Sequence, residues 1–121
     1  MRMLLADDNT IYRLAEHNGT VVGEISAKGY SRMALRHVAS LGMSVHKDYR
    51  GKGLGRSMLQ EVIGAARAGG IIKRIELGVY ERNTPARRLY ESMGFEYEGC
   101  RRNFIFQDGE YHNDMMMALL L

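Results

Sequence analysis

Three glycines in a basic stretch are the residues of this sequence best suited to bind an anion. Gly51, Gly53 and Gly55 alternate in "DYRGKGLGRSM", where a strand pattern ends and a helical apolar pattern begins. Glycine destabilises a regular element by up to about 1 kcal/mol per residue, so a tight turn or a closely approaching ligand must compensate. A helix start presents unpaired N–H groups and the positive end of the helix dipole, which favour a phosphate. Positive side chains line the rim of this turn: Arg50, Lys52 and Arg56.

The glycine spacing excludes the two commonest nucleotide-binding loops. A mononucleotide P-loop reads GxxxxGK[ST], but Lys52 is followed by Gly53. A dinucleotide loop reads GxGxxG, whereas residues 51–55 read GxGxG. An acidic residue at the end of a second strand is also missing, because Glu76 lies inside its predicted strand. On the turn alone, a purely structural role without a ligand stays open.

The elements around the turn are predicted from hydrophobic periodicity. Residues 11–16 and 20–27 read as a hairpin around "HNG" (17–19), and residues 33–45 as a long third strand. A helix then follows the turn and ends at "AGG" (68–70). Its apolar face consists of Leu54, Met58, Leu59, Val62, Ile63 and Ala66.

A strand, a second helix and a hairpin complete the pattern. Residues 74–81 form the strand, with Ile75, Leu77 and Val79 on one face. Thr84 is the expected helix cap, Pro85 suits the first turn and Gly94 follows the end. Ala86, Leu89, Tyr90 and Met93 share one helix face, and two strands then flank the turn "QDGE" (107–110). The order β-β-β-α-β-α-β-β predicts an α/β (α+β) fold, a mixed sheet with helices packed on it.

Composition sets the broad class. The 121 residues suffice for one domain, 1–121, and 45% apolar with 26% charged residues is typical of soluble globular proteins. No apolar run reaches the roughly 20 residues of a membrane span, and "MRMLLADDNT" lacks the features of a signal peptide. The single cysteine, Cys100, then suggests a reducing cytoplasm. A net charge of +3, without zinc-ligand spacing or interleaved aromatic residues, argues against metal and nucleic-acid binding.

Two motifs together resemble the GNAT superfamily of N-acetyltransferases. Arg50, Gly53 and Gly55 fit R-x-x-G-x-G, the coenzyme A pyrophosphate motif of that superfamily. "NTPARRLYESMGF" fits its later helix motif N-x-x-A-x-x-x-Y-x-x-x-G-F, and one helix and one strand separate the two motifs, as in the superfamily. The matching residues are Asn83, Ala86, Tyr90, Gly94 and Phe95. The resemblance covers roughly residues 11–121 and is strongest to bacterial enzymes that acetylate amino acids or protein N-termini.

The resemblance implies acetyl-CoA as cosubstrate and a site for it. In the superfamily the pantetheine arm pairs with the strand before the glycine turn, which here means the backbone of Met43, Ser44 and Val45. An N–H in this segment would polarise the thioester carbonyl. The pyrophosphate would be held by the backbone of Arg50, Gly51, Lys52, Gly53, Leu54, Gly55 and Arg56.

The resemblance also implies roles on the second helix. Tyr90 would be the general acid for the leaving thiolate, because an ordinary tyrosine pKa of about 10 keeps it protonated at pH 7. The alternative is that Tyr90 only packs on the apolar face of the helix and has no catalytic role. Asn83, with Ala86 of the same motif, would contact the pantetheine arm or orient water. The alternative for Asn83 is a turn residue before the helix cap.

The sequence offers three candidates for the general base and does not distinguish among them. Glu24, His37 and Glu76 lie on predicted strands near the expected cleft. His37 has a suitable intrinsic pKa, although a lone strand histidine is more often structural. Cys100 has no matched histidine and is not expected to be a nucleophile.

Members of the superfamily usually carry a strand and two helices ahead of the first hairpin. Only 49 residues precede Arg50, so we expect a mostly antiparallel sheet of about six to seven strands with helices on both faces, but without those N-terminal elements. An apolar edge exposed by their absence would favour a homodimer.

The expected reaction is acetyl transfer to a primary amine, on a free amino acid, a peptide or protein N-terminus, or a small molecule. The basic net charge mildly favours amino acids or acidic peptides over polyamines. Two alternatives remain: a non-catalytic CoA-binding module, and an interaction domain with a structural glycine turn.

Overall fold

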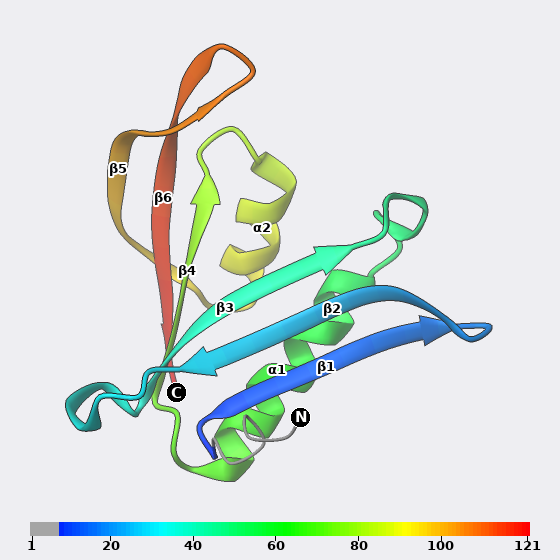
Figure 1. Cartoon of the computed structure of the whole chain (residues 1–121), viewed down its shortest axis with the longest axis vertical. Coiled ribbons are helices and arrows are strands. Elements are labelled where there is room, and N and C mark those ends of the chain that lie inside the picture. Colours follow the sequence, from blue (N-terminus) through cyan, green and yellow to red (C-terminus); the bar gives the residue numbers. More distant parts are fainter. Residues whose placement is uncertain (1–7) are drawn as a thin grey trace. The chain divides into compact units, whose positions relative to one another are not determined.

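The computed structural model describes residues 8–121. Residues 1–7, which hold most of the stretch expected to lack a signal peptide, lie outside this range. The chain forms two compact units, residues 1–75 together with Leu121, and residues 76–120. Six strands and two α-helices follow one another in the predicted order β-β-β-α-β-α-β-β, which confirms the mixed fold (Figure 1).

The first unit contains an antiparallel sheet of three strands. They are β1 (Thr10–His17), β2 (Thr20–Gly29) and β3 (Val38–Val45). Asn18 and Gly19 connect β1 to β2 with φ of 52° and 80°, the double left-handed conformation of a tight hairpin turn. A register shift opposite Ala15 and Glu16 leaves Val22 without a partner in β1 and puts a bulge in β2.

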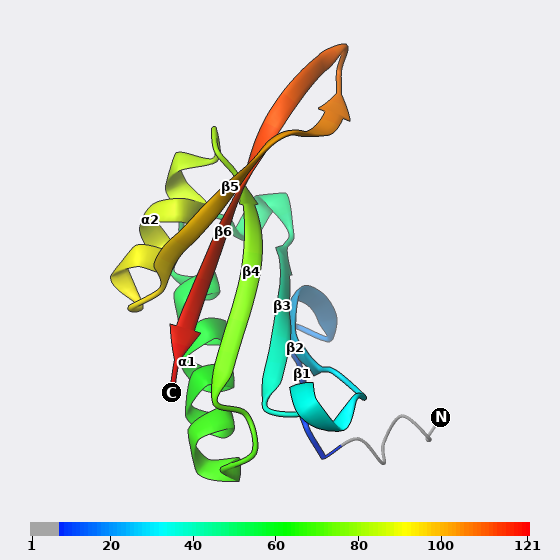
Figure 2. The same cartoon turned by 90° about the vertical axis from the view of Figure 1, so that its left-hand side faces the viewer.

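One face of this sheet is covered by α1 (Leu54–Gly69), which contacts all three strands (Figure 2). The predicted apolar helix face is confirmed: Met58, Leu59, Val62, Ile63 and Ala66 are buried, and Leu54 at the helix start is half-buried. In β2, Ile25 and Ala27 are fully buried. A Cβ on Gly23 would lie 3.2 Å from the Met58 side chain, so glycine allows the helix to pack closely there. The alternation of strand side chains therefore leaves Glu24 and Ser26 on the opposite face.

The third strand is shorter than predicted. Residues Met33–Leu35 form a 3-10 turn and the strand begins at Val38. His37 is an exposed turn residue whose carbonyl accepts hydrogen bonds from the N–H groups of Lys73 and Arg74. The prediction that His37 lies within a strand is therefore wrong, because His37 does not belong to the part of the chain that pairs with β2.

The second unit contains the C-terminal hairpin and a short helix. The strand β4 (Arg74–Tyr80) leads into this unit, followed by α2 (Thr84–Ser92), β5 (Glu96–Gln107) and β6 (Glu110–Leu120). The predicted turn at 107–110 is confirmed, with Asp108 and Gly109 both at positive φ. Ile75, Leu77 and Val79 are buried, as their alternation indicated.

Asn83, rather than Thr84, caps α2. The Asn83 side-chain oxygen accepts a hydrogen bond from the N–H of Ala86 at 3.3 Å, and Thr84 is the first helical residue. Both residue types cap helices well, and Pro85 at the second helical position fits either start. The cap prediction was thus wrong by one residue, and the carboxamide of Asn83 has a structural partner.

An ion pair between a buried carboxylate and a half-exposed arginine lies next to Gly78 of β4. Asp114 of β6 is 5% exposed and accepts hydrogen bonds from Arg101 of β5 at 2.6 and 3.1 Å. Arg101 also stacks on the Phe104 ring, with its guanidinium carbon 3.9 Å from the ring centre. A Cβ on Gly78 would lie 2.8 Å from both carboxylate oxygens of Asp114. Gly78 is therefore required for this carboxylate to sit where it does.

The outer strand β5 is irregular. Its register against β6 shifts between Tyr97 and Gly99 and again between Arg101 and Ile105. Asn103, inside the second shift, has a φ of 52°, and its N–H donates to the Asn113 side chain. These bulges bend the strand while β6 stays regular.

Candidate active site

The glycine turn joins β3 to α1. His46 accepts a hydrogen bond from the Asp48 N–H at 3.1 Å and begins a 3-10 turn, Lys47–Tyr49. Gly51 and Gly53 then have φ of 74° and 83°, a left-handed conformation that other L-residues adopt only with strain. A Cβ on either glycine would meet no atom within 4 Å. The backbone conformation, and not crowding by the protein, therefore requires glycine there, and the space around the turn is open.

The start of α1 has no side-chain cap. Gly53 is the N-cap and offers no side chain to accept from the first-turn N–H groups, and the first helical bond runs from the Ser57 N–H to the Gly53 carbonyl at 3.1 Å. Such an end carries partial positive charge and suits an anion. Lys52 is close by, with its ammonium 5.8 Å from the Tyr49 ring centre. Arg50 donates from Nε to the Val45 carbonyl at 3.1 Å and so ties the turn to β3.

The register of β3 shows which of its backbone groups point away from β2, to the edge that is called the outer edge of β3. The His46 N–H donates to the Val22 carbonyl at 2.8 Å. Because alternate residues of an antiparallel strand point to the same edge, Ser44 also faces β2, whereas Met43 and Val45 face away from it. The expectation that all three backbones could pair with a ligand thus needs correction for Ser44, whose backbone groups point into the ladder to β2.

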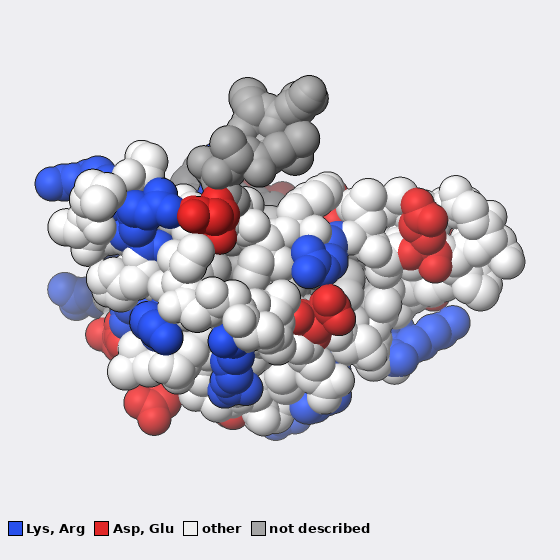
Figure 3. Space-filling view, turned by 90° about the horizontal axis from the view of Figure 1, so that it is seen from below, with Lys and Arg blue, Asp and Glu red and all other residues white. Residues whose placement is uncertain are grey.

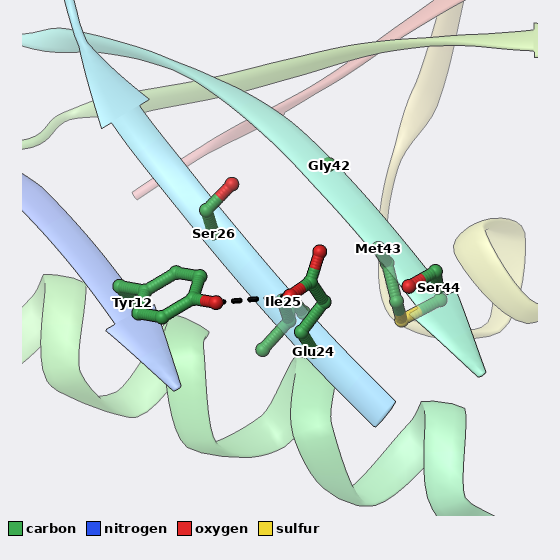
Figure 4. A pocket seen from close by; sticks show the side chains of 7 residues that line it. All are labelled: Tyr12, Glu24, Ile25, Ser26, Gly42, Met43 and Ser44. Carbon is green, nitrogen blue, oxygen red and sulfur yellow. Dashed lines mark hydrogen bonds between the residues drawn. The ribbon is translucent and has the colours of Figure 1, made fainter. Parts of the chain in front are cut away.

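A hollow of about 240 Å³ lies on the face of the β1–β3 sheet opposite α1 (Figure 4). It is lined by Tyr12, Glu24, Ile25, Ser26, Gly42, Met43 and Ser44, and is called the β1–β3 hollow. The Tyr12 hydroxyl donates to Glu24 Oε2 at 2.9 Å, and Figure 4 shows the two side chains meeting across the strands. This hydrogen bond raises the pKa of Tyr12 above its usual 10.0. Tyr12 is thus a neutral donor at physiological pH that holds the carboxylate in place.

Of the three candidate bases, the structure places Glu24 next to Met43 and Ser44 and separates His37 from them. His37 precedes the first residue of β3, and Ser44 lies near the other end. Seven residues at about 3.3 Å each separate them by roughly 23 Å. Glu76 belongs to the second unit and is half-buried.

Tyr90 is buried in the second unit. It is 9% exposed, packs against Phe95 with ring centres 5.6 Å apart, and burial raises its pKa above 10.0. Asn83 and Ala86 lie on the same helix, joined by the cap hydrogen bond. The second motif thus gives α2 a defined start and a protonated phenol on its buried face.

Residues 8–121 hold no group of three or more His, Cys, Asp or Glu side chains arranged to bind a metal. None of the helices in that range is both long and apolar enough to cross a membrane. On the face in Figure 3, basic and acidic side chains are interspersed, so the positive net charge is not gathered there into one basic patch.

Comparison with known proteins agrees with both motifs. The model of the acetyltransferase (GNAT) family matches residues 2–95. The L-amino acid N-acetyltransferase AaaT of Escherichia coli is 32% identical over 101 residues, which are 84% of this chain and 62% of that protein. This chain thus spans less than two thirds of that relative's length.

Solved structures share the fold. An acetyltransferase of the GNAT family from Streptococcus pneumoniae superposes with a TM-score of 0.93 and 33% identity, over 97% of this chain and 70% of that one. The yncA protein of Salmonella typhimurium, solved with its cofactor acetyl-CoA, gives a TM-score of 0.85 and 28% identity, over 94% of this chain and 66% of that one.

Proposed function

This chain belongs to the acetyltransferase (GNAT) family, and from that premise we propose that it transfers an acetyl group from acetyl-CoA to a primary amine. The observation that carries the proposal is the glycine turn at the end of β3. Two left-handed glycines, open space around them and a helix start without a side-chain cap suit the binding of a diphosphate. The turn directly follows the strand whose outer edge carries the Met43 and Val45 backbone.

In this proposal the cofactor is held mainly by backbone. N–H groups of the segment from Arg50 to Arg56 bind the pyrophosphate, with Lys52 adding positive charge at the rim. The pantetheine arm pairs with the outer edge of β3 through Met43 and the Val45 N–H, since the Val45 carbonyl already accepts from Arg50. Asn83 and Ala86 contribute by fixing the start of α2.

The proposed chemistry needs one base and one acid. The amine nitrogen attacks the acetyl carbon, the amide C–N bond forms, and the C–S bond breaks. Glu24 takes the proton from the amine, directly or through a water, because it is the carboxylate of the β1–β3 hollow. Tyr90 gives its proton to the departing thiolate, and its raised pKa keeps it protonated at neutral pH.

The experiment is acetyl transfer by the purified chain. Acetyl-CoA is incubated with amines of several classes, and free CoA thiol and acetylated amine are both measured. In parallel, acetyl-CoA at 100 times its Kd should raise the free energy of unfolding by roughly 2.7 kcal/mol. Stabilisation without transfer would indicate a CoA-binding module. If acetyl-CoA causes neither stabilisation nor transfer, the proposed cofactor site is rejected.

Location and assembly are further parts of the proposal. Cys100 is exposed and free, as suits a reducing cytoplasm. In the second unit, Phe104, Phe106 and Tyr111 are exposed apolar side chains that a second copy could cover in a homodimer. Analytical ultracentrifugation of the chain with and without acetyl-CoA tests the assembly.

A further inference from the structure

We infer that the β1–β3 hollow is the acceptor site and that it selects an amine whose neighbouring carboxyl group is already in amide linkage, as at a peptide N-terminus. This rests on the proposed acetyl transfer, and it adds a substrate class to it. A free α-amino acid carries a carboxylate beside its ammonium, whereas a peptide N-terminus carries a neutral carbonyl. The charge of the hollow distinguishes the two.

The hollow carries a single formal charge, and that charge is negative. Glu24 is the only lining residue with an acidic or basic side chain besides Tyr12, whose hydroxyl donates its proton to Glu24. The Tyr12 bond engages Glu24 Oε2 and leaves Oε1 to accept from an ammonium. Ser44 lies directly across from Glu24 in the β2–β3 register and offers a hydroxyl. This set can bind an ammonium and a neutral carbonyl.

No described side chain that lines the hollow offers a cation for a substrate carboxylate. Lys28 is on the same sheet face, but it lies four residues beyond Glu24, or about 13 Å along β2. Arg13 binds Glu61 of α1 at 3.2 Å, on the other side of the sheet. Arg50 is bound to the Val45 carbonyl. A free amino acid would therefore bring its carboxylate close to Glu24 without compensation.

The hollow also has the room and the position for the reacting amine. Its volume of about 240 Å³ is large enough for several water molecules. Gly42 keeps it open, since a Cβ there would lie 3.5 Å from Ser26 Oγ and would fill space without a clash. Met43 and Ser44 line the hollow, and Met43 also faces the outer edge of β3. An amine bound here thus lies against the strand proposed to hold the thioester.

The experiment compares kcat/KM for L-alanine, L-alaninamide and L-alanyl-L-alanine with saturating acetyl-CoA. Alaninamide lacks the carboxylate beside the amine, but its amine also has a lower pKa than that of alanine. Each kcat/KM is therefore expressed per unprotonated amine, so that the comparison isolates the charge. Two like unit charges about 6 Å apart at an effective dielectric constant near 40 repel each other by about 1.4 kcal/mol, which corresponds to a tenfold change in kcat/KM. We expect alaninamide and the dipeptide to exceed alanine by at least about tenfold.

Variants show whether Glu24 causes this preference. Glu24→Gln should bring the amide-to-acid ratio close to one, even as both rates fall. Ser26→Lys should raise the rate with alanine relative to alaninamide, and it keeps the test decisive if Glu24→Gln is inactive. The matched control is Glu61→Gln, an exposed carboxylate on the helix side of the same unit, which should leave the ratio unchanged. Gly42→Ala should raise KM for the amine and leave that for acetyl-CoA unchanged.

The outcomes separate this inference from the proposed function. Alanine acetylated as well as alaninamide, or a ratio unaffected by Glu24→Gln and Ser26→Lys, would overturn the acceptor class while the transferase activity stands. Acetyl-CoA that stabilises the chain without transfer to any of the three amines would also overturn it. If acetyl-CoA neither stabilises the chain nor releases CoA, the proposed function fails together with the inference.

Discussion

Replacing Gly53 by alanine tests the glycine turn at the residue that begins α1. Gly53 is the N-cap with φ of 83°, and a Cβ there meets no atom within 4 Å. Alanine therefore causes no clash, and its direct effect is the cost of a left-handed conformation, about 1–2 kcal/mol. We expect Gly53→Ala to lower the free energy of unfolding by that amount.

Gly64 provides the matched control. It lies in the exposed interior of the same helix, and its added Cβ would also meet nothing within 4 Å. Because alanine is favoured over glycine inside a helix, Gly64→Ala should raise the free energy of unfolding by about 0.8–1 kcal/mol. The same substitution in the same helix should thus change stability in opposite directions.

The assay is urea unfolding of the wild type and both variants, with and without acetyl-CoA. At a concentration of 100 Kd, the wild type should gain roughly 2.7 kcal/mol from the ligand. If the new methyl group and the strained turn weaken binding tenfold, Gly53→Ala should gain only about 1.4 kcal/mol. Gly64→Ala should keep the full gain.

Two results would refute the reasoning. If Gly53→Ala is as stable as the wild type, the left-handed turn does not require glycine. If it is less stable but gains as much from acetyl-CoA as Gly64→Ala, the turn is strained for structural reasons alone and the diphosphate binds elsewhere.

Further predictions concern the second unit. Gly78→Ala should destabilise by about 1–3 kcal/mol in thermal unfolding, because a methyl 2.8 Å from the Asp114 oxygens forces this carboxylate to move relative to Arg101; an unchanged midpoint would show that the pair shifts freely. Tyr90→Phe should lower kcat by at least about tenfold with little change in acetyl-CoA affinity, and unchanged turnover would remove Tyr90 from the chemistry. Because burial raises the Tyr90 pKa, its share of stability is complete below pH 10 and is lost as pH rises through the folded pKa, so Tyr90→Phe should unfold less readily in alkali than the wild type. Asn83→Ala should cost about 1 kcal/mol in urea unfolding through the lost cap of α2, whereas an unchanged midpoint would mean that the cap does not matter.

Much of the fold was predictable because its signals are local. The apolar face of α1 repeats at helical spacing, the Asn18–Gly19 pair marks a tight hairpin, and the glycine turn stands between two clear periodicities. The residue at which β3 begins, just after His37, was less predictable, because an apolar run can form either a strand or a short 3-10 turn. The cap of α2 was ambiguous for a similar reason, since Asn83 and Thr84 are adjacent and both residue types cap helices.

The β1–β3 hollow depended on a feature that the sequence did not reveal. Counting back from the Asn18–Gly19 turn without irregularity would pair Tyr12 with Ile25 and point the tyrosine toward α1. The bulge at Val22 of β2, opposite Ala15 and Glu16, shifts the register by one residue and pairs Tyr12 with Ser26 instead. Since a one-residue shift moves a side chain to the other face, the bulge is what brings Tyr12 to Glu24. Among the lining residues, Glu24 could be named in advance as one of three candidate bases, and Met43 and Ser44 as part of the strand expected to bind the cofactor.

The irregular course of β5 constrains how a second copy could associate. A regular outer strand is a template onto which another chain adds its own strand by backbone pairing, and this leads to open-ended aggregation. In β5 the two register shifts and the left-handed Asn103 interrupt the repeat of N–H and C=O groups that such growth requires. Association of copies at this edge should therefore use side-chain surfaces such as Phe104 and Phe106 and not an extended β-ribbon.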